Sequence, residues 1–197
     1  MIPNAHYSNV ETEEAFADRF PLPYSYLKNY EGLLRARASY RRYQSHLPFY
    51  VIYCVGDYTF SPHKVVWMEQ QDPASFRAVV VSSLDTAEAQ QKLVVPDHKL
   101  YFAALGSADE AHYLCGFLNS APVRAWLGGF LHGKQIATTI FEYMNVPAYD
   151  PMNARCIAIA DILNEAHSTR ANMREPGLLD DNTERLLARH VKAVCTP

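Results

Sequence analysis

The chain has 197 residues, of which 49% are hydrophobic, 20% charged and 12% aromatic, the composition of an ordinary globular protein. This composition excludes disordered, collagen-like and low-complexity proteins. The formal net charge of −3 argues against a protein that coats nucleic acid by its overall charge, although it leaves room for a local basic patch.

The chain begins with a predicted N-terminal extension, residues 1–23, which is polar and acidic and ends in prolines that stop a helix. An amphipathic helix is predicted over residues 24–46. The basic residues of this helix are Lys28, Arg35 and Arg42, spaced by seven on one face, with Arg37 and Arg41 beside them. Together with the interleaved tyrosines, this clustering favours contact with phosphates over a merely solvated face.

Short runs of β-branched and aromatic residues then predict a small mixed or antiparallel sheet of about four to six strands. The runs are residues 49–55, 58–60, 64–68, 76–81, 93–95 and 100–105.

Helix signals return after the sheet. Ser107 and Glu110 form a capping box at the start of a helix that breaks at Asn119. Pro122 opens a second, short helix that runs to Gly128-Gly129. A loop rich in glycine follows.

An irregular connection is expected over residues 130–149, followed by two helices at 152–172 and 180–194. The order of elements predicts an α+β fold with a small sheet, flanking helices and a C-terminal helical tail. The expected division is the extension, a domain over residues 24–150, and a helical tail over residues 151–197 that packs on this domain or on a partner.

The cysteine spacing and the N-terminal residues indicate the cellular compartment in which the protein is expected. No two of the four cysteines have Cys-x-x-Cys spacing, so a zinc ribbon or a redox pair is not expected. The N-terminus has no signal-peptide pattern, and no apolar stretch approaches the length of a membrane span. We therefore expect reduced thiols in a cytoplasmic protein without a membrane partner.

Common catalytic motifs are absent from the sequence. There is no Gly-x-Ser-x-Gly and no pair of histidines at metal-ligating spacing. The complete phosphate-binding motif Gly-x-x-x-x-Gly-Lys-Ser/Thr is also absent, because residues 128–134 have the Gly-x-x-x-x-Gly-Lys spacing but Gln135 follows the lysine. The glycine-rich loop 128–135 carries His132, Lys134 and Gln135, whose side chains suit base edges in a major groove. A plain flexible connection explains this loop equally well.

Two segments resemble a known family. Residues 58–67 are Tyr-Thr-Phe-Ser-Pro-His-Lys-Val-Val-Trp, and residues 110–120 are Glu-Ala-His-Tyr-Leu-Cys-Gly-Phe-Leu-Asn-Ser. In this order, with Val-Pro-Asp-His-Lys at residues 95–99 between them, they resemble the C-terminal target-recognition region of large adenine-specific DNA methyltransferases. These enzymes belong to restriction-modification and phage-defence systems. The resemblance covers most of the chain, from about residue 20 to about residue 167.

The resemblance implies a specificity module that binds double-stranded DNA while a catalytic domain or subunit transfers the methyl group. The sequence lacks the Asn-Pro-Pro-Tyr-type loop and the glycine-rich S-adenosylmethionine motif of the family's catalytic half. No cofactor and no catalytic residue are therefore expected on this chain, and S-adenosylmethionine would bind the partner. The terminal helices would dock that partner or pair with a second copy in a homodimer.

The resemblance also implies roles for single residues. The side chains expected to contact phosphates are Lys28, Arg35, Arg42, Lys64 and Lys99. The side chains expected to contact bases are His132, Lys134 and Gln135. The spacing of Trp67, Tyr113 and Leu118 assigns them to the core, and Asn119-Ser120 is expected to cap and break helices.

Two other functions stay open. Asp85, Asp97 and Lys99 resemble the two acids and the lysine of metal-dependent nucleases, in which carboxylates hold a divalent cation. A protein-interaction scaffold is the third interpretation: its helical tail would bind a partner, and its basic helix would only be solvated.

Overall fold

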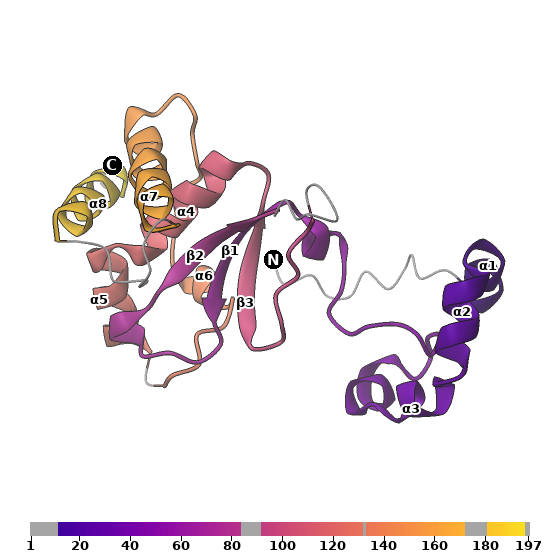
Figure 1. Cartoon of the computed structure of the whole chain (residues 1–197). Helices are drawn as coiled ribbons and strands as arrows, with labels where there is room; N and C mark the ends of the chain where they lie inside the picture. The colour runs from indigo at the N-terminus through magenta and orange to yellow at the C-terminus, as the bar shows by residue number, and fades with distance from the viewer. Residues whose placement is uncertain (1–11, 84–91, 132, 172–180, 196–197) are drawn as a thin grey trace. The chain divides into compact units, whose positions relative to one another are not determined.

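The computed structural model describes residues 12–83, 92–131, 133–171 and 181–195 (Figure 1). The chain divides into two compact units, one from Met1 to Thr59 and the other from Phe60 to Pro197. The division falls inside the domain expected over residues 24–150, at neither of the expected boundaries. The fold is α+β, as the sequence predicts, and among the described residues 55% are helical and 12% are in strands or bridges.

The first unit contains short helices. They are α1 (Glu13–Arg19), α2 (Pro21–Lys28), α3 (Glu31–Ala36) and the π-helical turn η2 (Tyr40–Gln44). The Thr12 hydroxyl accepts the backbone N–H of Ala15 and caps α1. Pro21 occupies the first turn of α2, where its missing N–H costs nothing. A helix therefore does stop before the prolines, since α1 ends at Arg19, but a second helix begins at Pro21 itself.

The prediction of a single helix over residues 24–46 is wrong. Helix α2 ends at Lys28, and after α3 the backbone of Arg37 is extended. The Arg37 guanidinium donates hydrogen bonds to the carbonyl groups of Phe49 (3.0 Å) and Val51 (2.7 Å). These bonds hold the following segment against the helices. They also explain why residues 49–55 do not form the predicted strand, since their carbonyl groups accept from an arginine instead of a neighbouring strand.

The second unit is built on a three-stranded antiparallel sheet in the order β2-β1-β3. The strands are β1 (His63–Met68), β2 (Ala78–Ser82) and β3 (Leu100–Leu105). They confirm three of the predicted strands. Residues 58–60 instead belong to the 3₁₀ helix η3 (Asp57–Phe60), and residues 93–95 form no strand. In the register, Trp67 of the central strand lies opposite Ala78 and Tyr101.

The helices of the second unit largely follow the prediction. They are α4 (Ala108–Asn119), α5 (Ala121–Phe130), α6 (Ile140–Tyr143), α7 (Ala154–Ala171) and α8 (Asp181–Val194), with a 3₁₀ turn, η4 (Pro73–Ser75), before β2. The Ser107 hydroxyl accepts the N–H of Glu110 at 3.2 Å, which confirms the predicted cap. Helix α5 ends at Phe130, one residue beyond the predicted end at Gly128-Gly129, and α6 lies within the connection expected to be irregular.

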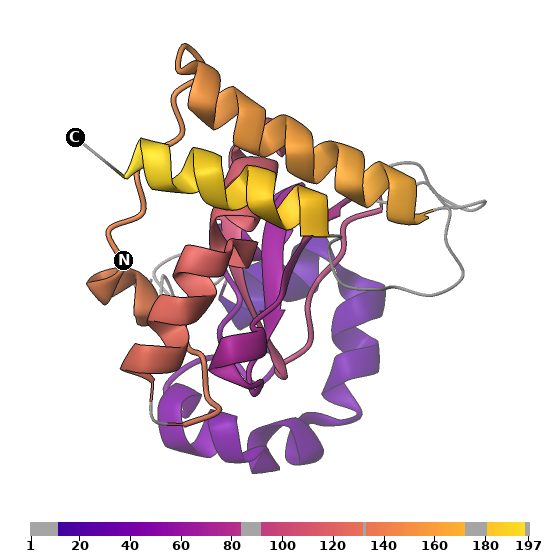
Figure 2. The same cartoon turned by 90° about the vertical axis from the view of Figure 1, so that its left-hand side faces the viewer.

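Helix α4 lies between the sheet and the pair formed by α7 and α8 (Figures 1 and 2). Every residue from Tyr113 to Ser120 is buried. Trp67, Tyr113 and Leu118 all belong to this core, as the sequence predicts. The C-terminal helices expected as a tail therefore cover the core of the second unit.

Asn119, at the end of α4, forms hydrogen bonds with Ala78, the first residue of the edge strand β2. Its amide oxygen accepts the Ala78 N–H at 2.9 Å, and its amide nitrogen donates to the Ala78 carbonyl at 2.8 Å. The Ser120 hydroxyl donates to the Phe117 carbonyl at 2.7 Å where the helix ends. The structural assignment of Asn119-Ser120 is confirmed, and Asn119 in addition joins helix to sheet.

Gly116 sets the distance between α4 and α7. A Cβ atom at this position would lie 2.7 Å from Cγ2 of Ile159 and 2.8 Å from Cδ2 of Leu163. Both α7 side chains are themselves fully buried, so neither can move aside freely. Only glycine allows this close approach of the two helices.

Replacing Gly116 by alanine is expected to lower the free energy of unfolding by about 1–3 kcal/mol through overpacking. A loss of stability would be informative, because alanine in a helix is by itself about 1 kcal/mol more favourable than glycine. Gly129→Ala is the matched control, since a Cβ at Gly129 in α5 meets nothing within 4 Å and should stabilise the protein slightly. Urea denaturation of both variants measures the difference, and equal stabilities would contradict this account of the helix packing.

Candidate nucleic-acid interface

Segments far apart in the sequence meet where β1 ends. Because β1 is antiparallel to β2 and β3, its C-terminal end lies beside the start of both. The N–H of Glu69 donates to the Lys99 carbonyl, and the N–H of Ile136 donates to the Glu69 carbonyl, both at 2.9 Å. The N–H of Gln71 donates to the Lys134 carbonyl, also at 2.9 Å. Residues 69–71 therefore hold both the start of β3 and the loop after α5.

The loop is also fixed from the core. The Trp67 indole N–H donates to the Ile136 carbonyl at 2.7 Å, and Ile136 itself is fully buried. Gln135 lies opposite Gln70 in an antiparallel bridge. The side chains of Lys134 and Gln135 are exposed beside this anchor. The loop thus presents polar side chains from a backbone that is held by residues 69–71 and by the Trp67 indole.

We call Glu69, Lys99, Lys134 and Gln135 the sheet-end site. The Glu69 carboxylate lies 3.6 Å from the Lys99 ammonium and 3.5 Å from the Gln135 amide nitrogen. The Lys99 side chain is 70% exposed, whereas that of Glu69 is 22% exposed. The structure brings together one residue expected to contact phosphates and two expected to contact bases, around a carboxylate that sequence reasoning missed.

In the first unit, carboxylates neutralise much of the predicted basic face. Lys28 Nζ lies 2.7 Å from Glu13 and 2.9 Å from Glu31, and the Arg35 guanidinium donates to Glu31 at 2.7 Å. Hydrogen bonds from Lys28 and Arg35 lower the pKa of Glu31, and the two carboxylates raise the pKa of Lys28. A phosphate that bound Lys28 or Arg35 would have to displace these partners.

Arg42 is placed differently. It is exposed on the turn η2, and its guanidinium carbon lies 5.1 Å from the centre of the Tyr43 ring. Within the described residues, no carboxylate forms an ion pair with Arg41 or Arg42. These two arginines, and not a stripe along one helix, are the exposed cations of the first unit that lack a carboxylate partner in the described structure.

Lys64 does not lie where a phosphate can reach it. It is 1% exposed in β1, donates to the Ser61 carbonyl, and lies 5.9 Å from the centre of the Phe102 ring. Burial lowers its pKa. Its expected phosphate contact is therefore wrong: the strand pattern located Lys64 near a strand end but did not reveal that both faces of β1 are covered.

The remaining expected positions are only partly described. His132 and Asp85 lie outside the described residues. Asp97 is exposed, and its carboxylate forms a hydrogen bond with the His98 ring. This hydrogen bond lowers the pKa of Asp97. Across the described ranges, no group of three or more His, Cys, Asp or Glu side chains is arranged to hold a metal ion.

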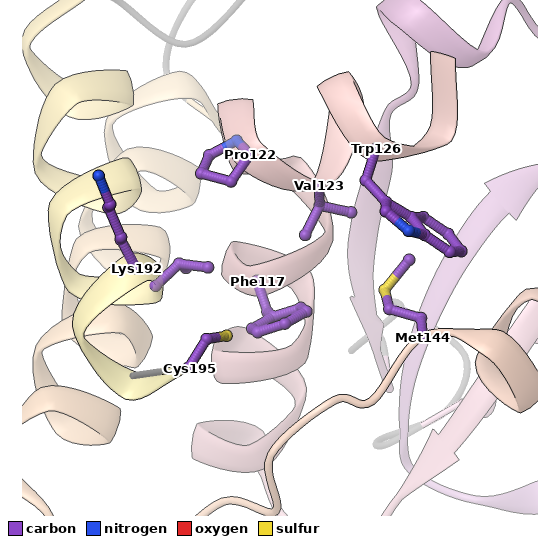
Figure 3. Close-up of a pocket in the computed structure, with 8 residues that line it drawn as sticks. Phe117, Pro122, Val123, Trp126, Met144, Lys192 and Cys195 are labelled. Carbon is purple, nitrogen blue, oxygen red and sulfur yellow. The ribbon is translucent and has the colours of Figure 1, made fainter. Parts of the chain in front are cut away.

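A pocket of about 250 Å³ lies between α4, α5 and α8 (Figure 3). The side chains of Trp126 and Met144 lie close together on one side, with Lys192 and Cys195 on the other. Burial raises the pKa of Cys195, which keeps its thiol protonated at neutral pH. The pocket is mostly apolar and offers no activated nucleophile.

The sequence did contain a signal for the missed part of the sheet-end site. The run Glu-Gln-Gln-Asp at residues 69–72 follows β1 directly, where polar side chains after a buried strand mark a sheet edge open to a ligand. The hydrogen bond from Trp67 to Ile136 had no such signal. It joins residues far apart in the chain, so only the folded arrangement reveals it.

No protein-family model matches the chain, and a search of curated proteins finds no match. Among the helices of the described ranges, none combines the length and the apolar character needed to cross a membrane. What the chain binds is therefore inferred from its own residues and their geometry.

Replacing Lys64 by methionine is expected to raise the free energy of unfolding at pH 7 by about 1–3 kcal/mol, because the buried ammonium gives up hydration that methionine does not need. The pKa of Lys64 is lowered in the folded state, so the unfolded chain binds more protons between that pKa and the ordinary value of 10.5. The wild type should therefore gain stability relative to the variant as the pH rises through that window.

Urea denaturation of both proteins from neutral pH to about pH 10 tests this expectation. Comparing the two at each pH removes the titration of tyrosines and cysteines, which both proteins share. A variant that is less stable than wild type at every pH would mean that the bond from Lys64 to Ser61 outweighs the cost of burying the charge.

Proposed function

We propose that this chain is the DNA target-recognition module of an adenine-N6 DNA methyltransferase of a restriction-modification or phage-defence system. It binds duplex DNA and leaves methyl transfer to a catalytic domain or subunit that holds S-adenosylmethionine. The observation that supports DNA binding in this proposal is the sheet-end site, where Lys99, Lys134 and Gln135 come together from distant parts of the sequence. The methyltransferase partner is what the resemblance of residues 58–67 and 110–120 implies. In this proposal the protein works in the cytoplasm, where that partner and DNA are present.

The chemistry of the site suits a major groove. A lysine ammonium pairs with a phosphate, or with the O6 and N7 acceptors of guanine, and a glutamine amide matches the N6 and N7 groups of adenine. The backbone of the loop is held by residues 69–71 and by Trp67. Because the backbone at residues 134–136 is already held by these bonds, little conformational entropy is lost when the side chains of Lys134 and Gln135 bind.

Binding to duplexes of mixed sequence across a salt series tests the proposal. Lys99→Ala is expected to weaken binding to every duplex alike and to reduce the slope of log K against log salt by about one. Gln135→Ala is expected to relax preference at one base pair, by about 1–3 kcal/mol. Fluorescence anisotropy measures the first effect, and selection from random DNA measures the second.

Arg189→Ala on α8 is the matched control, since Arg189 is an exposed cation on the helix layer that lies beyond α4 from the sheet. It should leave both the affinity and the sequence preference unchanged. The proposal is wrong if the protein binds no duplex at the lowest salt, alone or together with a methyltransferase catalytic subunit.

Replacing Glu69 by glutamine is expected to act in the opposite direction. It removes the one negative charge of the sheet-end site, so affinity for any duplex should rise by about two- to fivefold at low salt. The gain should shrink as salt screens the charges. Glu165→Gln on the exposed side of α7 is the charge-matched control, and an equal gain in both variants would mean that only the net charge matters.

A further inference from the structure

The first unit contains a long stretch without acidic residues. Residues 32–56 include no Asp or Glu but four arginines, at positions 35, 37, 41 and 42. Arg35 forms an ion pair with Glu31, and the guanidinium N–H groups of Arg37 donate hydrogen bonds to backbone carbonyl groups. Arg41 and Arg42 remain on the surface of η2, so this turn is a local site of positive charge on a chain that is negative overall.

Two tyrosines are stacked beside this charge. The ring centres of Tyr43 and Tyr53 lie 4.9 Å apart with an angle of 17° between the planes. Both residues are well exposed, at 45% and 41%. A second aromatic cluster of this unit is less exposed: in it, Phe16 and Phe49 contact Tyr24 and Tyr50.

Stacked aromatic rings next to arginines suit one class of ligand. Unpaired bases stack on tyrosine rings and on guanidinium planes, while arginines bind the phosphates that join them. The bases of an intact duplex cannot do this, because their faces are covered by the neighbouring base pairs. A ligand for this surface must therefore expose both base faces and phosphates.

We propose that Tyr43 and Tyr53, with Arg41 and Arg42, form a binding site for single-stranded nucleic acid. The rings stack on one or two unpaired bases, and the arginines contact the adjoining phosphates. This proposal rests on the first unit alone and does not depend on duplex recognition at the sheet-end site. The two sites can be tested separately in the full chain.

Binding of labelled oligodeoxythymidine and oligouridine to the full chain tests the site. Tyr43→Ala is expected to weaken binding of the preferred strand by about 5- to 150-fold, the value of a lost base-stacking contact. Tyr43→Phe keeps the ring and should bind like the wild type. Arg42→Ala is expected to reduce the salt slope by about 0.7, the value for one phosphate of a single strand.

The chain offers a matched control in Tyr26, which is more exposed than Tyr43 and lies 5.3 Å from Tyr30 at a tilt of 57°, without parallel stacking. Tyr26→Ala should leave binding unchanged. An abasic strand of the same length should bind the wild type and Tyr43→Ala alike, because it offers phosphates but no base to stack.

The outcomes separate clearly. A loss on Tyr43→Ala that Tyr43→Phe restores and Tyr26→Ala does not share supports the site, and comparison of the two oligonucleotides identifies DNA or RNA as the preferred ligand. The proposal is overturned if neither strand binds at low salt, or if Tyr43→Ala and Tyr26→Ala have equal effects. Duplex binding that depends on Lys99 is unaffected by either result.

Discussion

The close approach of α4 and α7 at Gly116 is the constraint on which the second unit depends. It lets the middle helix be buried against the sheet on one side and against α7 and α8 on the other. At the end of the same helix, the Asn119 amide satisfies both backbone groups of Ala78 on the edge strand. One helix thus fixes the distance to the outer helices and also holds the edge strand of the sheet.

The parts of the fold that local signals specify were predictable. Alternating and β-branched runs located β1, β2 and β3, and the Ser107 cap located the start of α4. The first unit was predicted poorly because its form depends on contacts that sequence periodicity does not contain. Arg37 binds carbonyl groups more than ten residues away, and these bonds override both the heptad spacing of the basic residues and the apolar run that resembled a strand.

The candidate site shows the same division between local and distant information. Lys99, Lys134 and Gln135 could be named from residue type and position, since exposed polar side chains at strand ends and in glycine-rich loops are common in binding sites. Their proximity depends on the backbone bonds to residues 69–71 and on the Trp67 indole. Lys64 shows the converse error, because a lysine in a strand was taken as exposed although the sheet buries it.

The loop after α5 is attached to the sheet through main-chain groups and through a tryptophan that lies outside the loop. None of these bonds uses the side chain of Lys134 or Gln135, and within the described residues the only side-chain hydrogen bond of the two is the 3.5 Å one from the Gln135 amide to the Glu69 carboxylate. Mutations at these two positions therefore leave the attachment intact, and natural variation can change the chemistry of the surface while the scaffold stays the same. A protein built this way can diverge quickly in what it binds, and the same two positions are the natural place to begin a library for altered specificity.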